Sequence, residues 1–237
     1  MMALKKIFVF AACAFWLVGR PAFAYFEEYP PYFFKQGAPK QFQAKLLLED
    51  GQTEFLSGDG KLVIRLKHAE DAYSFLLQDG DTVLAKVDEA ADFFVEQVYQ
   101  ADLDKNGFLD LIVFSSSRGA GLGAHFGVVD IYLKSSLIRY EHIHYESFGA
   151  GPEDFVDLDG DGRAEVIVGS FYQGEKHNYY AYSVYGIENG KLVNADAKHA
   201  GFPKFVQYTN RRNDQNDSRL TPQEKAGHIR KVESRFQ

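Results

Sequence analysis

Two short stretches of this sequence place oxygen-bearing side chains at alternate positions. The first reads DLDKNGFLDLIV from Asp102, and the second reads DLDGDGRAEVIV from Asp157. Each has carboxylates or an amide at positions 1, 3 and 5, a glycine at position 6 and an acid at position 9. Carboxylates crowded into a tight turn repel one another unless a cation lies between them. The spacing therefore predicts two cation-binding loops.

The predicted ligands are all oxygen atoms. Side chains at positions 1, 3 and 5 converge on one point, the carbonyl of position 7 faces inward, and the acid at position 9 completes the shell. Such flexible oxygen sets suit Ca²⁺ better than Mg²⁺, so we expect one or two calcium ions. In the second loop the ligands are Asp157, Asp159, Asp161, the carbonyl of Arg163, and Glu165. In the first loop they are Asp102, Asp104, Asn106, the carbonyl of Phe108, and Asp110. The uncharged Asn106 predicts that the first site is weaker.

Two other interpretations of the loops lead to different chemistry. A helix–loop–helix calcium hand requires a bidentate Glu at position 12. That position is Val113 in the first loop and Val168 in the second, so a calcium hand is excluded. The alternative that stays open is a polar hairpin without an ion, in which Asp side chains accept hydrogen bonds from their own backbone.

The acidic loops recur within a longer repeat, whose interval is the separation of Asp102 from Asp157. In both copies the loop is followed by an apolar run, a second apolar segment and a turn, at 135–136 and at 189–190. A third copy lies upstream, where 72–75 resembles 181–184 at about twice the repeat interval and leads into a turn at 79–80. Its acidic loop is reduced to the letters SGDG. We therefore expect three copies of one unit.

Each unit consists of short apolar segments that are typical of β-strands. Strands are predicted at 42–48, 62–66, 73–77, 83–87, 94–99, 109–114, 128–133 and 137–145. Asn-Gly and Asp-Gly between such segments indicate hairpins. Four strands in about 55 residues have the size of a propeller blade, so we expect an all-β fold of about three propeller-like units. Three blades leave an incomplete ring unless segments near Ala44 and at 205–208 supply a fourth. Otherwise the units stack as an open, twisted array.

The C-terminal part has a different pattern. Residues 210–219 are polar and predict a linker. Thr221 and Glu224 form a predicted capping box, with Pro222 at the first helical position. Apolar side chains at helical spacing then form one stripe; they are Ala226, Ile229, Val232 and Phe236. We expect a C-terminal helix docked on the β body, within a linker-and-helix segment at 210–237.

The N-terminal segment 1–24 has the layout of a secretory signal peptide. Lys5 and Lys6 precede an apolar stretch that is too short to span a bilayer, and a small-x-small site ends at Ala24. We expect cleavage near Ala24, a β-repeat domain at 25–209, no transmembrane segment in the mature chain, and a periplasmic or secreted location. Without the charges of Lys5, Lys6 and Arg20, the net charge of −7 becomes −10. This acidity argues against nucleic-acid partners.

The stretch DLDGDGRAEVIV, preceded by Phe148-Gly149-Ala150-Gly151-Pro152, resembles the FG-GAP/VCBS repeat of integrin-like β-propellers and of many exported bacterial proteins. The resemblance covers 101–115 and 148–170 and is limited to the general pattern elsewhere. It implies a propeller-like fold, structural calcium in the loop between two strands of a blade, and a role in adhesion or ligand binding. A weaker resemblance, in a Gly-rich loop followed by a Tyr-bearing strand, is to bacterial lysozyme inhibitors and immunity proteins.

These observations favour an exported calcium-binding protein that acts by binding a protein or glycan in the cell envelope rather than by catalysis. One alternative is a periplasmic inhibitor or immunity protein against a lysozyme-like hydrolase. Another is a calcium-dependent hydrolase of cell-wall material. The Gly-rich loop at 117–127 predicts a recognition surface with Arg118 and His125 as polar contacts.

Two further patterns carry less weight. Gly119-x-Gly121 after a strand fits part of a dinucleotide fingerprint, but a strand follows it where that motif requires a helix. His142 and His144 alternate and therefore face the same side of a strand. A Zn²⁺ site requires a third ligand nearby, and Glu141 faces the other side. The two histidines are therefore interpreted as solvent-facing side chains on a hairpin.

Overall fold

A computed structural model of the protein describes residues 52–56, 61–69, 72–87, 93–117, 126–207 and 220–236. Five predicted features lie outside the described residues. They are the signal peptide at 1–24, the strand near Ala44, the reduced loop at 57–60, the contacts Arg118 and His125 of the Gly-rich loop, and the linker at 210–219.

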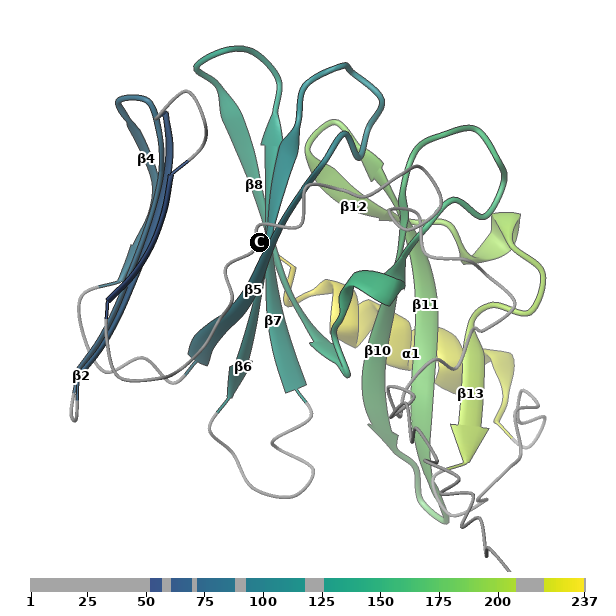
Figure 1. The fold of residues 1–237 in the computed structure, drawn as a ribbon. Coiled ribbons are helices and arrows are strands. Elements are labelled where there is room, and N and C mark those ends of the chain that lie inside the picture. The colour runs from purple at the N-terminus through teal and green to yellow at the C-terminus, as the bar shows by residue number, and fades with distance from the viewer. Residues whose placement is uncertain are drawn as a thin grey trace, which may run out of the picture.

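The described chain is mainly β, with three antiparallel sheets side by side (Figure 1). The first sheet contains β1 (Gln52–Leu56), β2 (Leu62–Ala69), β3 (Ala72–Asp79) and β4 (Thr82–Val87). The second contains β5 (Phe93–Ala101), β6 (Asp110–Ser117), β7 (Phe126–Lys134) and β8 (Tyr140–Phe148). The third contains β9 (Phe155–Val156), β10 (Glu165–Gln173), β11 (Asn178–Glu188), β12 (Lys191–Asn194) and β13 (Lys204–Gln207). Within each sheet the first four strands follow one another in chain order, which confirms three all-β units.

The repeat interval of the sequence is visible in the positions of the turns. Asp79, Lys134 and Asn189 are separated by the same interval as Asp102 and Asp157, and each lies at or directly after the end of the third strand of its sheet. Asn189 and Gly190 have positive φ, at 51° and 72°, and join the paired residues Glu188 and Lys191, as an Asn-Gly hairpin requires. In the first sheet Asp79 pairs with Thr82, so the turn is Gly80-Asp81 rather than the predicted Asp79-Gly80, and Gly80 has φ 58°. The acidic loops join the first strand to the second in the second and third sheets. The sequence repeat is therefore a structural repeat.

The segment at 205–208 does not begin a fourth unit. Its described part belongs to β13, which pairs antiparallel with β11, so that Tyr179 lies opposite Gln207. The fourth strand of the third unit is β12, which occupies the other end of the same long β11 strand. Because β11 is 11 residues long, it has room for both partners. The described residues contain three sheets and no closed ring (Figure 1).

Apolar side chains fill the spaces between the sheets. One cluster joins the first sheet to the second, through residues such as Ile64, Leu77 and Leu111. A second cluster joins the second sheet to the third, through Ile131, Val166 and their neighbours. The middle sheet is thus covered on both faces, and β7 has two runs of three buried residues. Burial on both faces explains why its strands read as continuous apolar runs.

Helix α1 (Pro222–Glu233) confirms the predicted C-terminal helix. Thr221 Oγ1 accepts a hydrogen bond from the Glu224 N–H at 3.2 Å, and the Glu224 carboxylate accepts one from the Thr221 N–H at 2.7 Å. Ile229 and Val232 are buried. Another member of the predicted stripe, Ala226, is exposed, so the apolar face is narrower than expected. No helix in the described part of the chain has the length and apolarity needed to cross a bilayer.

Candidate metal centre

Within positions 1 to 7, the two acidic loops share three hydrogen bonds between equivalent positions. In each loop the N–H of the glycine at position 6 donates a hydrogen bond to the carboxylate at position 1. The distance is 2.9 Å from Gly107 to Asp102 and 3.2 Å from Gly162 to Asp157. In each loop the N–H of position 5 also donates a hydrogen bond to the carboxylate at position 3, at 3.2 Å in the first loop and 3.1 Å in the second. The N–H of position 7 donates to the position-5 side chain at 2.7 Å in both loops.

Backbone conformation repeats in the same way. At position 6, Gly107 has φ 88° and Gly162 has φ 87°, which a residue with a Cβ rarely adopts. The sharp bend predicted at this position is therefore confirmed. At position 4 the second loop has Gly160 at φ 80°, whereas the first has Lys105 at φ 60°. A lysine in this left-handed region is uncommon.

The acids at position 9 are buried beneath the loops. Asp110 is 0% exposed and Glu165 is 7% exposed. Each accepts a hydrogen bond from the leucine at position 2 of its own loop, Leu103 at 2.8 Å and Leu158 at 2.7 Å. Burial raises the pKa of both carboxyl groups to about 7, and the neighbouring loop carboxylates act in the same direction. A nearby cation would reverse this shift, because it favours the ionised form.

Three acids in each loop bring carboxylate oxygens together. Oxygens of Asp102, Asp104 and Asp110 lie within 4.8 Å of one another, and the same is true of Asp157, Asp159 and Glu165. These six residues are six of the eight predicted side-chain ligands.

The other two predicted side-chain ligands stand at position 5. The Asn106 amide donates to Asp104 Oδ2 at 3.0 Å and to the Lys134 carbonyl at 2.9 Å. Asp161 Oδ1 accepts from the Arg163 N–H and lies outside the group of three acids. The hydrogen bonds from backbone N–H groups to side chains are the ones expected of a polar hairpin. The converging carboxylate oxygens are the arrangement expected of a cation site. An all-oxygen set of this kind fits Ca²⁺.

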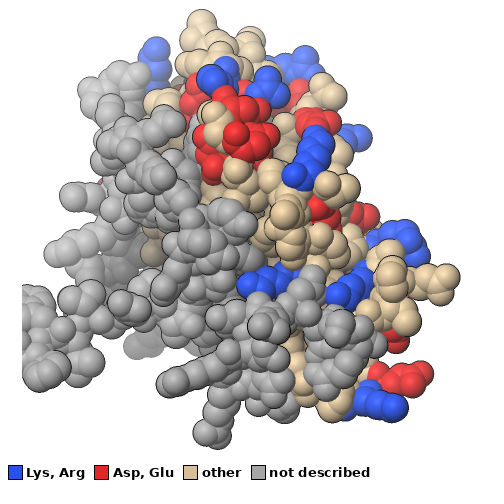
Figure 2. Space-filling model, turned by 90° about the vertical axis from the view of Figure 1, so that its right-hand side faces the viewer, with Lys and Arg blue, Asp and Glu red and all other residues tan. Residues whose placement is uncertain are grey.

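The two loops contact each other, at the same end of their sheets (Figure 1). Lys105 Nζ donates to the carbonyl oxygen of Asp161 at 2.5 Å. The Ala164 N–H donates to the carbonyl oxygen of Leu103 at 2.8 Å. Figure 2 shows Asp and Glu side chains gathered near the top of one face of the molecule, with Lys and Arg beside them. Because of these two hydrogen bonds, a structural change in one loop would displace groups that contact the other loop.

The first loop is also tied to the β7–β8 and β3–β4 turns. Asp110 Oδ1 accepts from the Lys134 N–H at 2.7 Å. The Lys134 ammonium forms an ion pair with Asp79, and the Tyr140 hydroxyl also donates to Asp79. These contacts connect the first loop to the ends of β3 and β7, in the first and second sheets.

A third group of possible ligands was missed in the sequence. Asp130 on β7 lies with His142 and His144 on β8, within 4.8 Å. The two histidines do face the same side, but both bond to Asp130, so the prediction that they are simply solvent-facing is incomplete. Burial alone would raise the pKa of Asp130, but the bonds from His142 and His144 outweigh it and hold that pKa below its ordinary value. The sequence did not indicate Asp130 as the third ligand, because its position opposite His144 depends on the register of β7 and β8.

A cavity of about 640 Å³ lies between α1 and the third sheet. Tyr172, Phe171 and Phe126 supply aromatic lining. The charged lining residues are two basic and two acidic, Lys231, Arg235, Glu146 and Glu224, and Arg235 forms an ion pair with Glu146. Two polar atoms of its lining, Ser170 Oγ and His228 Nε2, are 2.8 Å apart. The sequence did not indicate this cavity, because it depends on where the helix docks. The predicted contacts Arg118 and His125 lie outside the described residues.

Comparisons with known protein families, curated proteins and solved structures returned no match to this chain. The resemblance to FG-GAP/VCBS repeats therefore stays a prediction that rests on the residues of the two loops.

Proposed function

We propose that this chain is an exported calcium-binding β-repeat protein of the FG-GAP/VCBS type, which acts as a binding module in the cell envelope. Calcium has a structural role in this proposal, and the units are propeller blades in an incomplete ring. The supporting observation is the pair of acidic loops, which lie one repeat interval apart and share hydrogen bonds, backbone bends and three converging carboxylates.

The charge and burial of these carboxylates favour an ion in each loop. Asp110 and Glu165 are buried beside two further acids, an arrangement that disfavours ionisation unless a cation is present. Because the loops contact each other and the β7–β8 turn, ions at these points would stiffen one end of the sheets. Neighbouring surfaces would then be held in fixed positions for a partner.

We assign partner contact to the cavity between α1 and the third sheet. Cavities with aromatic walls and a few polar groups are the usual form of ligand sites. The lining of this cavity combines the basic Lys231 and Arg235 with the acidic Glu146 and Glu224, and Arg235 lies 3.8 Å from Glu146. This mixture of charges beside aromatic walls favours a hydroxyl-rich partner group.

Thermal unfolding with and without calcium tests the proposal. Saturation at a hundred times the dissociation constant adds about 2.7 kcal/mol per site to the free energy of unfolding. Asp104→Asn and Asp159→Asn keep an oxygen for the backbone N–H but remove one charge, so each removes most of the gain from its own loop. Asp81→Asn, in the exposed β3–β4 turn, is the matched control and keeps the full gain. If calcium leaves the unfolding temperature unchanged, the polar-hairpin interpretation replaces ours.

A second measurement tests binding. Protein immobilised in calcium should retain an envelope component and release it when a chelator is added. A Lys231→Glu and Arg235→Glu double variant should lose retention while keeping its calcium response. Retention that is unaffected by this double variant would argue against the cavity as the binding surface.

A further inference from the structure

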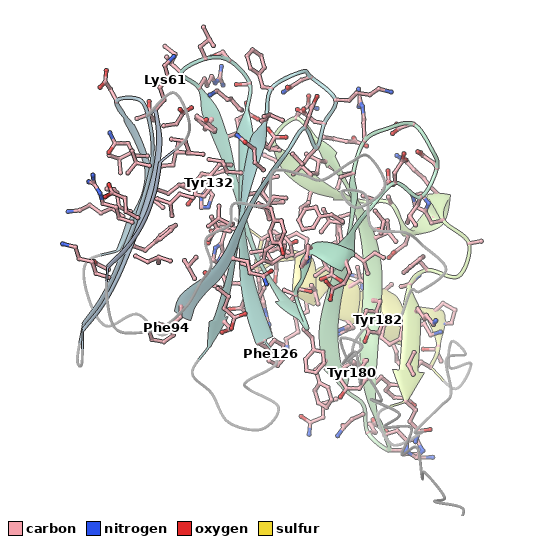
Figure 3. All side chains as sticks on the ribbon, in the orientation of Figure 1. Lys61, Phe94, Phe126, Tyr132, Tyr180 and Tyr182 are labelled. Carbon is pink, nitrogen blue, oxygen red and sulfur yellow. The ribbon has the colours of Figure 1, made fainter. Side chains whose placement is uncertain are left out.

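The middle sheet places two imidazoles and one carboxylate on the same face. Asp130 on β7 lies directly opposite His144 on β8, and Tyr132 lies directly opposite His142. Residues two apart in a strand point to the same side. These side chains therefore share the face from which Tyr132 extends toward the first sheet (Figure 3).

The donor atoms converge on one point. Asp130 Oδ1 is 2.8 Å from His142 Nε2 and 2.8 Å from His144 Nδ1. Two imidazole nitrogens thus approach a single carboxylate oxygen from two residues of one strand. The ligand atoms of all three residues lie within 4.8 Å of one another, which is close enough for one ion to contact all of them.

The surroundings orient these ligands and leave them accessible. The His142 ring stacks on Tyr132, with centroids 4.7 Å apart and planes inclined by 12°. The Asp130, His144 and His142 side chains are 21%, 29% and 48% exposed, so solvent reaches the group. Paired strands hold the three backbone positions in a fixed register, which a surface loop would not do.

We propose that Asp130, His142 and His144 form a binding site for a divalent transition-metal ion of the Zn²⁺ class. Imidazole nitrogen suits zinc, copper and nickel, whereas calcium prefers oxygen ligands, so this site differs in chemistry from the acidic loops. Three protein ligands leave one tetrahedral position open for water or for a group of a partner molecule. The proposal does not depend on calcium binding.

Zinc binding to the tag-free protein tests the site directly. The protein used begins at Tyr25, after the predicted cleavage site, and therefore lacks Cys13, the only cysteine of the sequence. Calcium in excess competes with zinc for the acidic loops. Competition with a chromogenic zinc chelator should then show one equivalent of zinc. The His142→Ala and His144→Ala double variant should lose it while keeping its calcium stoichiometry, and Asp130→Asn should weaken it by about 10-fold or more. His199→Ala, which lies between β12 and β13, is the control and should bind zinc normally.

A measurement on the unsubstituted histidines covers the case in which a variant fails to fold. Nitrogen NMR of the histidine rings should show zinc-dependent shifts at Nε2 of His142 and Nδ1 of His144, with His177 and His199 unchanged. Failure to take up zinc at micromolar levels would overturn the proposal. So would zinc retained in full by the folded double variant, because the ion would then lie elsewhere.

Discussion

The ammonium group of Lys105 in the first acidic loop donates a hydrogen bond to the carbonyl oxygen of Asp161 in the second loop, at 2.5 Å. Lys105 occupies the position at which the second loop has Gly160, and it has a positive φ that lysine rarely adopts. The contact therefore joins two equivalent loops through a residue that breaks their equivalence. It places a fixed positive charge beside the second group of acids.

Lys105→Met should change stability and calcium affinity in opposite directions. Without calcium, the loss of one exposed bond lowers the free energy of unfolding by about 1 kcal/mol or less. With calcium, the second loop binds more tightly, because a competing positive charge has been removed. Lys105→Arg keeps the charge and is the control. Calorimetric calcium titration of the three proteins checks this, and unchanged affinity in Lys105→Met would show that the charge is screened.

Asn106→Asp should raise the calcium affinity of the first loop and lower the free energy of unfolding of the metal-free protein. The Asn106 amide donates to Asp104 and to the Lys134 carbonyl, and an aspartate has no such donor. The free energy of unfolding in chelator should fall by about 1–3 kcal/mol. Calcium affinity should rise, because ligand charge tunes such sites. Asn178→Asp, at the exposed start of β11, should do neither. A variant that is more stable in chelator would contradict the described network.

The leucine at position 2 connects the loop to the core. Leu103 is 0% exposed and belongs to the cluster between the second and third sheets, whereas Leu109 at the other end of the loop is 47% exposed. Leu103→Ala should therefore lower the free energy of unfolding by about 2–5 kcal/mol. Leu109→Ala should change it by about 0.5 kcal/mol or less. Urea unfolding of both variants measures the difference, and equal effects would mean that the loop is not anchored through Leu103.

His228 makes stability depend on pH. Burial, with the positive charges of Lys231 and Arg235, lowers its pKa to about 4, against an ordinary value near 6.5. Between these values the unfolded chain binds a proton that the folded chain does not, so this histidine's contribution to stability is lost as pH falls from about 6.5 toward 4. His228→Gln should reduce that slope. Unfolding measured across this range checks the difference between the two proteins, and parallel curves would contradict the assignment.

Much of the fold could be predicted from sequence because its signals are local. The acidic loops, the Asn-Gly turn and the capping box at Thr221 each depend on residues a few positions apart. Strand pairing between distant segments could not be predicted in the same way. The position of β13 beside β11 and the placement of Asp130 opposite His144 depend on register, which the sequence pattern does not specify.

In the candidate metal centre, too, local features could be predicted from the sequence and contacts between distant segments could not. The carboxylates that converge within each loop were identified from spacing alone. The buried state of Asp110 was not, because it depends on the packing of the loop residue Leu103 into the core and on the contact of Asp110 with the distant Lys134. The contact between the two loops was not predicted either, because it depends on the two loops lying at the same end of adjacent sheets.

Calcium content at equilibrium is the most direct measurement of the central claim. Dialysis of the tag-free protein against millimolar calcium, followed by elemental analysis, should give two ions per chain. The Asp159→Asn and Asp104→Asn variants should each have lost one. A wild-type protein that takes up no calcium under these conditions would contradict the account.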